Sequence, residues 1–208
     1  MNQTTTDANG SLRVAIDVGP AVGNPSGIPN AVSWTVDAIE ATDDVELLPY
    51  VTSMRAAVQP PTRRLPIPAA AALRLWAHSG PRADRWLGRP DVVHGTNYVV
   101  PPTRCPRVVS VYDCWFLEHP DDTVPDVRRA GAVLRRAIDE GVHVVTSSDA
   151  TSRRLRELFD IDDVRTVLLG PPRVGDPPPE RPASLPALDT APFVLSLSTV
   201  ERLSLIHI

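Results

Sequence analysis

The chain has 208 residues, which is enough for one full domain and the start of a second, and 42% of them are hydrophobic, so we expect a buried core. A formal net charge of −4 gives no sign of a nucleic-acid-binding surface, and no nucleic-acid partner is expected. The chain has no run of about 18 apolar residues, so no membrane span is predicted. Residues 1–11 lack the apolar segment of a signal peptide, and we expect a disordered tail there.

All 21 basic residues are arginine, which is typical of a GC-rich bacterial genome and excludes any mechanism that needs a lysine in this segment. The two cysteines, Cys105 and Cys114, flank a predicted strand and would lie about 25–30 Å apart. A disulfide requires Cα atoms within about 7 Å, so we expect free thiols and a reducing environment. No cluster of Cys and His has the spacing of a metal site, and no metal is expected.

Residues 12–18 form a near-continuous apolar run, as expected of a strand buried on both faces. A glycine-containing loop, residues 19–29, follows, and then Val32, Val36 and Ile39 recur at helical spacing. This order is typical of the start of a βαβ unit. The loop does not match the dinucleotide fingerprint G-x-G-x-x-G, so it does not predict an NAD site. It fits either a close approach of the backbone to a ligand or a tight turn with prolines.

A second strand is predicted over residues 45–51, and residues 60–90 are the least regular part of the chain. This part contains six arginines and one acid, Asp84, interleaved with apolar side chains. A basic amphipathic stretch can lie on an anionic membrane surface. The alternative, which we favour, is that helices pack over the sheet here and that the arginines are solvated.

Two short runs of β-branched residues each deliver polar side chains at their carboxyl ends. The first run is Val92 and Val93, and the second is residues 108–111. In an open parallel sheet, ligands bind outside the carboxyl ends of the strands, so the two runs predict two sides of one crevice. The polar residues are His94, Gly95, Thr96 and Asn97 after the first run, and Tyr112 and Asp113 after the second.

The remaining part of the domain alternates between helices and strands. A loop with an aromatic pair and His119 follows the second run. The spacing then predicts a helix over residues 127–140, a strand over 142–146, a helix capped by residues 147–149 that runs to Phe159, and a strand over 164–169. In the first of these helices we expect Val127, Val133 or Leu134, and Ala137 or Ile138 to face inward. This order predicts an α/β fold with a doubly wound parallel sheet over residues 12–170.

The last part of the chain differs in composition. Residues 171–192 hold eight prolines, which predicts a stiff linker. Residues 193–202 are predicted to be the first strand of a second, truncated domain. Residues 203–208 match a translation of the transposase mosaic-end adapter used in sequencing libraries, so we expect a non-native tail after Arg202. A genuine short strand is the alternative.

In their order and spacing, these segments resemble the N-terminal part of glycosyltransferase family 4, and in particular its bacterial mannosyltransferase-like members. The likeness covers about residues 12–202. It rests on Ser26-Gly27-Ile28 and on residues 91–102, 109–113, 116–120, 144–149, 167–170 and 193–201.

The resemblance implies a GT-B fold, in which two Rossmann-like domains face each other across a cleft. The N-terminal domain would hold the acceptor, and the C-terminal domain would hold the nucleotide-sugar and carry a paired-glutamate motif. The implied reaction moves a mannose or glucose-like sugar, with retention and without a metal or other cofactor, to a glycan or lipid-linked acceptor. It also implies a cytoplasmic enzyme with peripheral contact at the inner membrane face. Because the donor domain would be missing, we expect the 208-residue chain to be inactive.

Several site residues carry over by position. The substrate-binding positions implied are Gly27, Ile28, His94, Gly95, Asn97, Asp113 and His119. Tyr112 stands where the family usually has histidine, and a phenol cannot take up histidine's positive charge near pH 7. Tyr112 and Asp113 are the catalytic candidates. Structural interpretations remain open: His94 as a core histidine, Asp113 as a loop cap and Asn97 as a turn residue.

Two other functions compete with the transferase. One is a stand-alone Rossmann-like module that binds a sugar or a nucleotide, but a proline linker followed by a new strand argues against it. The other is a GT-B sugar epimerase, which would place acid and base residues in this cleft, where the sequence offers no convincing pair. A paired-glutamate motif further along the reading frame would support the transferase.

Overall fold

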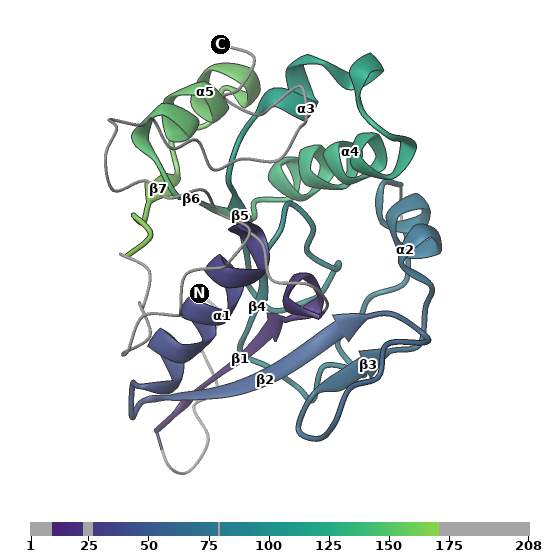
Figure 1. The fold of residues 1–208 in the computed structure, drawn as a ribbon, viewed down its shortest axis with the longest axis vertical. Helices are drawn as coiled ribbons and strands as arrows, with labels where there is room; N and C mark the ends of the chain where they lie inside the picture. Colours follow the sequence, from purple (N-terminus) through teal and green to yellow (C-terminus); the bar gives the residue numbers. More distant parts are fainter. Residues whose placement is uncertain (1–9, 23–26, 79, 171–208) are drawn as a thin grey trace, which may run out of the picture. The chain divides into compact units, whose positions relative to one another are not determined.

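The computed structural model describes residues 10–22, 27–78 and 80–170, and their elements belong to one compact unit that ends at Leu169. A seven-stranded parallel sheet with the order β3-β2-β1-β4-β5-β6-β7 forms its centre (Figure 1). The strands are β1 (Leu12–Asp17), β2 (Val45–Thr52), β3 (Arg63–Leu65), β4 (Val92–Gly95), β5 (Arg107–Val111), β6 (His143–Thr146) and β7 (Val164–Thr166).

The connections between the strands contain five helices and two short 3-10 turns among the described residues. They are α1 (Gly27–Glu40), α2 (Ala69–Trp76), α3 (Trp115–Glu118), α4 (Pro125–Asp139), α5 (Asp149–Phe159), η1 (Gly19–Ala21) and η2 (Pro120–Asp122). The predicted linker, second-domain strand and C-terminal tail, residues 171–208, lie outside the described residues, as do residues 1–9 of the predicted tail.

The predicted doubly wound parallel sheet is confirmed. From β1 the chain runs to β2 and β3 toward one edge of the sheet, and from β4 it runs through β5 and β6 to β7 at the other edge. The strand order therefore reverses between β1 and β4, which pair through residues such as Ile16 and His94. Such a reversal leaves a crevice outside the carboxyl ends of the two central strands.

Helices pack on both faces of the sheet. Because alternate residues of a strand point to opposite faces, neighbouring residues of one strand contribute to the packing on different sides. Ala15 and Val93 belong to one core cluster with the buried side chains of α2, α4 and α5. Ile16 points the other way and is fully buried, as is Val32 of α1, which packs against β2. The near-continuous apolar run in β1 thus reflects a strand buried on both faces.

The structure corrects several sequence-based boundaries. The segment after Asp113 was expected to be a loop, but it forms α3 and η2 because Phe116 packs into the core. Val127 was expected to face inward in α4, but 38% of its surface is exposed. The last strand was expected to reach residue 169, but β7 ends at Thr166, opposite the end of β6, its neighbour among the described strands. Both cysteines are free, as predicted.

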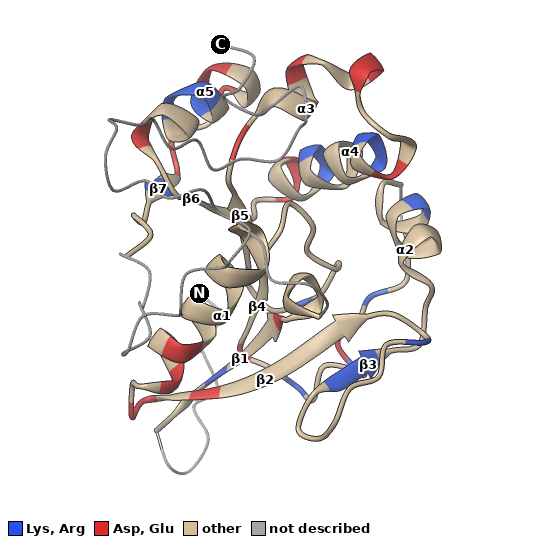
Figure 2. Cartoon of the chain, in the orientation of Figure 1, with Lys and Arg blue, Asp and Glu red and all other residues tan. Residues whose placement is uncertain are grey.

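The irregular arginine-rich part contains β3 and α2. Arginines appear in blue on β3 and on α2, α4 and α5 in Figure 2. The apolar side chains between them, Leu65, Trp76 and Leu87, are buried in the core. The arginines of this part are all exposed: Arg63, Arg64, Arg74, Arg82, Arg85 and Arg89. The helix therefore packs over the sheet as expected, and the exposed arginines are compatible with either a solvated or a membrane-facing surface.

Candidate functional site

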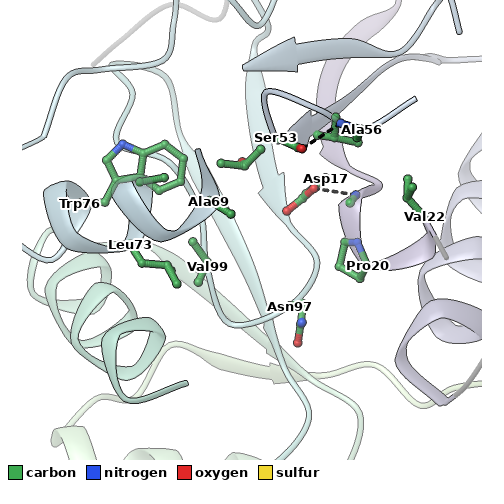
Figure 3. A pocket seen from close by; sticks show the side chains of 14 residues that line it. Asp17, Pro20, Val22, Ser53, Ala56, Ala69, Leu73, Trp76, Asn97 and Val99 are labelled. Atoms are coloured by element: carbon green, nitrogen blue, oxygen red, sulfur yellow. Dashed lines mark hydrogen bonds between the residues drawn. The ribbon is translucent and has the colours of Figure 1, made fainter. Parts of the chain in front are cut away.

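A pocket lies at the carboxyl ends of β1, β2 and β4, next to the reversal of the strand order. Its volume is about 420 Å³, within the range of about 300–1,000 Å³ that is typical of small-molecule sites. Figure 3 shows Leu73 and Trp76 of α2 on one side of the pocket and Asp17 on the other. Ligands bind at such a switch point in open α/β sheets, so this pocket is the candidate site.

Asp17 is the last residue of β1, and its carboxyl group lines the pocket. Its Oδ1 accepts a hydrogen bond from the Gly19 N–H at 2.8 Å, whereas Oδ2 accepts none from the described residues. Burial outweighs this bond and raises the pKa of Asp17 from 3.8 to about 7. A Cβ at Gly19 would lie 2.9 Å from Oδ1, so a larger residue there would displace the Asp17 carboxyl group. A carboxyl group poised near neutrality in a pocket is typical of functional sites.

A buried tyrosine is the neighbour of Asp17 on β2. Tyr50 pairs with Asp17 in the register of the two strands, and its side chain is fully buried. Its hydroxyl has no hydrogen-bond partner among the described residues. Burial, and to a smaller extent the charge of Asp17, raise the pKa of Tyr50 well above 10, so the phenol is neutral. Asp17 therefore has an uncharged neighbour on β2.

The end of β4 supplies two further polar residues. The Thr96 hydroxyl donates a hydrogen bond to the Asp17 carbonyl at 2.7 Å, which ties the ends of the two central strands together. Asn97 lines the pocket, and its Oδ1 is buried without a hydrogen-bond partner among the described residues. Such an unpaired acceptor costs about 1–3 kcal/mol.

A tight turn fixes Asn97. The Val99 N–H donates to the Asn97 carbonyl at 2.7 Å, and Tyr98 between them has a φ of 59°. Bulky residues rarely adopt this left-handed conformation. The Tyr98 hydroxyl donates to Asp113 Oδ2 at 2.7 Å, and its ring meets two other aromatic rings edge-on. Contacts that follow β5 therefore hold the turn that places Asn97.

The two catalytic candidates follow β5, which is one strand beyond the strands that line the pocket. Both carboxylate oxygens of Asp113 are used within the fold, because Oδ1 accepts a hydrogen bond from the Trp115 N–H at 3.0 Å. Tyr112 is half-buried, and burial raises its pKa. Its carbonyl accepts a hydrogen bond from the Thr151 hydroxyl at 3.1 Å. These hydrogen bonds lie within the fold, and the catalytic role of both residues stays a prediction.

Two predicted binding residues of β4 also make structural contacts. His94 Nε2 lies 2.8 Å from Ser110 Oγ of β5. Burial lowers the pKa of His94 to about 4, so the ring is neutral near pH 7. A Cβ at Gly95 would lie 2.0 Å from the Val99 carbonyl oxygen. Only glycine therefore allows the chain to fold back over β4 and form the turn at Asn97.

The remaining predicted residues lie elsewhere. His119 is exposed, and its ring centroid is 5.2 Å from that of Trp115. Gly27 and Ile28 belong to the first turn of α1, where a Cβ on Gly27 would meet no atom within 4 Å. Of the predicted binding residues, the structure brings Asn97 into the lining of the pocket.

No protein-family model matches this chain, and no curated protein does. Across residues 10–22, 27–78 and 80–170, no group of three or more His, Cys, Asp or Glu side chains could hold a metal ion. Within the same ranges, no helix is long and apolar enough to cross a membrane. The functional assignment therefore depends on the residues of the pocket and their geometry.

Asp17 is the pocket residue that reasoning from the sequence missed. A charged residue that ends a buried apolar strand is itself a signal, and the rule that drew attention to His94 and Asp113 applies equally to it. Nothing comparable in the sequence indicated that Leu73 and Trp76 of α2 form an apolar wall of the pocket. Both lie in the irregular, proline-rich residues 60–90, where no regular apolar spacing marks the helix. Chemically, the pocket offers hydrogen-bond acceptors and one carboxyl group that can take up a proton near neutral pH.

Proposed function

We propose that this domain is the acceptor-side domain of a retaining glycosyltransferase of family 4 type with a GT-B fold. The enzyme would transfer a mannose or glucose-like sugar from a nucleotide-sugar to a glycan or lipid-linked acceptor. The observation that carries the proposal is the pocket at the reversal of the strand order, lined by Asp17 and Asn97 (Figure 3).

The chemistry of sugar transfer fits these two residues. An acceptor hydroxyl must be held in one orientation before it attacks the anomeric carbon of the donor. The Asp17 carboxyl group lines the pocket and can accept a hydrogen bond, Asn97 adds a polar side chain to the lining, and Leu73 and Trp76 supply an apolar wall. The resulting pocket has the usual form of a small-molecule site, with mostly apolar walls and a few polar groups that set orientation.

The charge of the pocket supports a proposal in which the acceptor and the nucleotide-sugar bind to different domains. Asp17 is the one charged side chain among the described residues that line the pocket. A carboxylate repels the diphosphate of a nucleotide-sugar, so the proposal assigns the donor to a second domain. The reaction as proposed uses neither a metal nor a bound cofactor.

The proposal places the enzyme in the cytoplasm, in peripheral contact with the inner membrane face and without a nucleic-acid partner. The exposed arginines of β3 and α2, Arg63, Arg64 and Arg74, support this location. Each basic side chain near an anionic bilayer contributes about 1 kcal/mol of attraction.

The test uses an extended protein, in which residues 1–202 are continued by the reading frame that follows Arg202 in the gene. We expect the extended protein, incubated with nucleotide-activated mannose or glucose and a lipid-linked or glycan acceptor, to transfer the sugar in the presence of EDTA. NMR of the product should show the anomeric configuration of the donor. Inversion at the anomeric carbon, or an absence of transfer across a panel of nucleotide-sugars and acceptors, would contradict the proposal.

A further inference from the structure

We propose that an apolar slot beside the pocket, between β3, α2 and residues 81–86, binds the hydrocarbon chain of a lipid phosphate, whose phosphate group lies on arginines next to the slot. The inference rests on the proposed function and deepens it, because it assigns the acceptor to the lipid-linked class rather than to free glycans. It adds to the domain a second binding site, separate from the pocket that contains Asp17.

The slot has apolar walls. Its volume is about 140 Å³, and it is lined by Leu65, Ile67, Trp76, Ala83 and Trp86 and by two exposed prolines. Leu65, Trp76 and Ala83 are almost completely buried. No charged side chain of the described residues lines the slot, so its interior suits hydrocarbon. Since whole ligands occupy about 300–1,000 Å³, a slot of this size suits one part of a ligand, such as a single chain.

Three arginines lie beside the slot. The Arg85 guanidinium lies over the ring of Trp86, 4.1 Å from the ring centroid, and Arg82 belongs to the same lining segment. Arg63 of β3 reaches this segment as well, because a Cβ at Gly88 would lie 2.9 Å from Arg63 Cζ. All three arginines are exposed, and none of them forms an ion pair with a described residue.

The charge of this region is opposite in sign to that of the whole chain. Residues 60–90 contain six arginines and one acid, Asp84, whereas the formal net charge of the chain is −4. Asp84 Oδ1 accepts a hydrogen bond from the Arg104 N–H at 2.7 Å, so this carboxylate is engaged within the fold. Figure 2 shows the arginines of β3 in blue at the edge of the sheet. Guanidinium groups bind phosphate through two parallel hydrogen bonds, and the arginines therefore match an anionic group of this kind.

The combination of an apolar interior and neighbouring arginines selects the class of ligand. A lipid phosphate offers a hydrocarbon chain for the slot and a phosphate group for the arginines. An acidic peptide would match the arginines, but its charged side chains would not fill the apolar interior. The two features together therefore favour a lipid phosphate.

Trp76 links the slot to the pocket. It is the last residue of α2 and lines both cavities (Figure 3). A lipid phosphate in the slot would therefore lie next to the pocket in which the acceptor hydroxyl is proposed to bind. A free glycan has no hydrocarbon chain and would leave the slot unused, which is why the slot favours a lipid-linked acceptor.

The experiment titrates the full chain, labelled with nitrogen-15, with monomeric geranyl phosphate. The chain has four tryptophans, whose indole N–H signals are the readout. Trp76 and Trp86 line the slot, whereas Trp34 and Trp115 belong to α1 and α3. We expect saturable shifts of the Trp76 and Trp86 signals and none of the other two. Geraniol, which lacks the phosphate, and inorganic phosphate, which lacks the chain, should each bind at least about tenfold more weakly.

Variants complete the test. The double variant Arg82→Gln, Arg85→Gln removes two exposed charges beside the slot and should weaken binding of geranyl phosphate about tenfold. The matched control Arg128→Gln, Arg153→Gln removes the same charge from α4 and α5 and should bind like the wild type. Wild-type affinity in the folded Arg82→Gln, Arg85→Gln variant would overturn the inference.

Further outcomes separate this ligand from other partners. Equal shifts of the slot tryptophans with hexaglutamate would overturn the inference and indicate an acidic protein. Binding to anionic phosphatidylglycerol vesicles without a response to monomeric geranyl phosphate would also overturn it and indicate adsorption to a membrane surface. Equal kcat/KM of the extended protein for acceptors with and without a hydrocarbon chain would overturn the inference alone. Binding of geranyl phosphate without any sugar transfer by the extended protein would instead overturn the proposed function alone.

Discussion

At the scale of single residues, the burial of the Asp17 carboxyl group costs folding free energy, and no ion pair with a described residue compensates for it. Burial raises its pKa to about 7 although the Gly19 N–H donates a hydrogen bond to it. Among the residues that the structure describes, no cation pairs with this carboxylate. An apolar residue at the end of β1 would avoid the cost. A carboxyl group with a raised pKa that lines a pocket is typical of functional sites.

This cost predicts a pH-dependent effect on stability. The pKa of Asp17 is higher in the folded protein than the ordinary 3.8, so the folded state binds an extra proton between these values and is destabilised as pH rises toward 7. Asn at this position keeps an oxygen that accepts the Gly19 hydrogen bond but does not ionise. We expect Asp17→Asn to raise the free energy of unfolding by about 2 kcal/mol at pH 8 and to have a much smaller effect at pH 4.5.

Urea unfolding of wild type and variant at the two pH values measures this difference. Part of the surface of Asp17 is exposed, which is why the expected gain is smaller than the full pKa shift implies. His94, whose pKa is about 4, affects both proteins equally and cancels in the comparison. An equal difference at both pH values would contradict the account of Asp17. Asp163→Asn, at an exposed site, should change stability little at either pH.

At the scale of elements, the turn after β4 depends on the segment after β5. Tyr98 adopts a left-handed φ of 59° and is held by its hydrogen bond of 2.7 Å to Asp113. The turn places Asn97, and Gly95 provides the space for the chain to fold back. Asp113 is therefore a positioning residue, which reaches the pocket through Tyr98.

Removal of the Tyr98 hydroxyl tests this link. In Tyr98→Phe, the Asp113 carboxylate loses the hydrogen bond that the Tyr98 hydroxyl donates to it. We expect the free energy of unfolding to fall by about 1–3 kcal/mol. The turn should also loosen, which would shift the NMR signal of the Asn97 side-chain amide. Tyr112→Phe serves as the control on the neighbouring ring. Unchanged stability and an unshifted Asn97 signal in Tyr98→Phe would show that the turn does not depend on this bond.

At the scale of the whole molecule, the sequence was sufficient to predict the sheet but only part of the site. Apolar β-branched runs marked β1, β2, β4, β5 and β6, because strands buried on both faces need such runs. β3 was missed because it has three residues, two of which are exposed arginines. Its pairing with β2 depends on the tertiary fold rather than on local pattern.

The contacts of the site residues were less predictable for a similar reason. The partner of His94 is Ser110, and the register between β4 and β5 that brings them together is not visible in either segment alone. The left-handed conformation of Tyr98 likewise depends on the distant Asp113. By contrast, Asn97 was predicted from the rule that polar residues at the carboxyl ends of central strands meet at one crevice, and the same rule, had it been applied to β1, would have indicated Asp17.

The most direct test of the central claim is the steady-state kinetics of the extended protein with Asp17→Asn and Asn97→Ala. If the pocket holds the acceptor, kcat/KM for the acceptor should fall about tenfold or more in both variants, while KM for the nucleotide-sugar stays near its wild-type value. Asp163→Asn should match the wild type in both constants. Wild-type acceptor kinetics in both pocket variants, or a loss confined to the nucleotide-sugar KM, would contradict the assignment of this pocket to the acceptor.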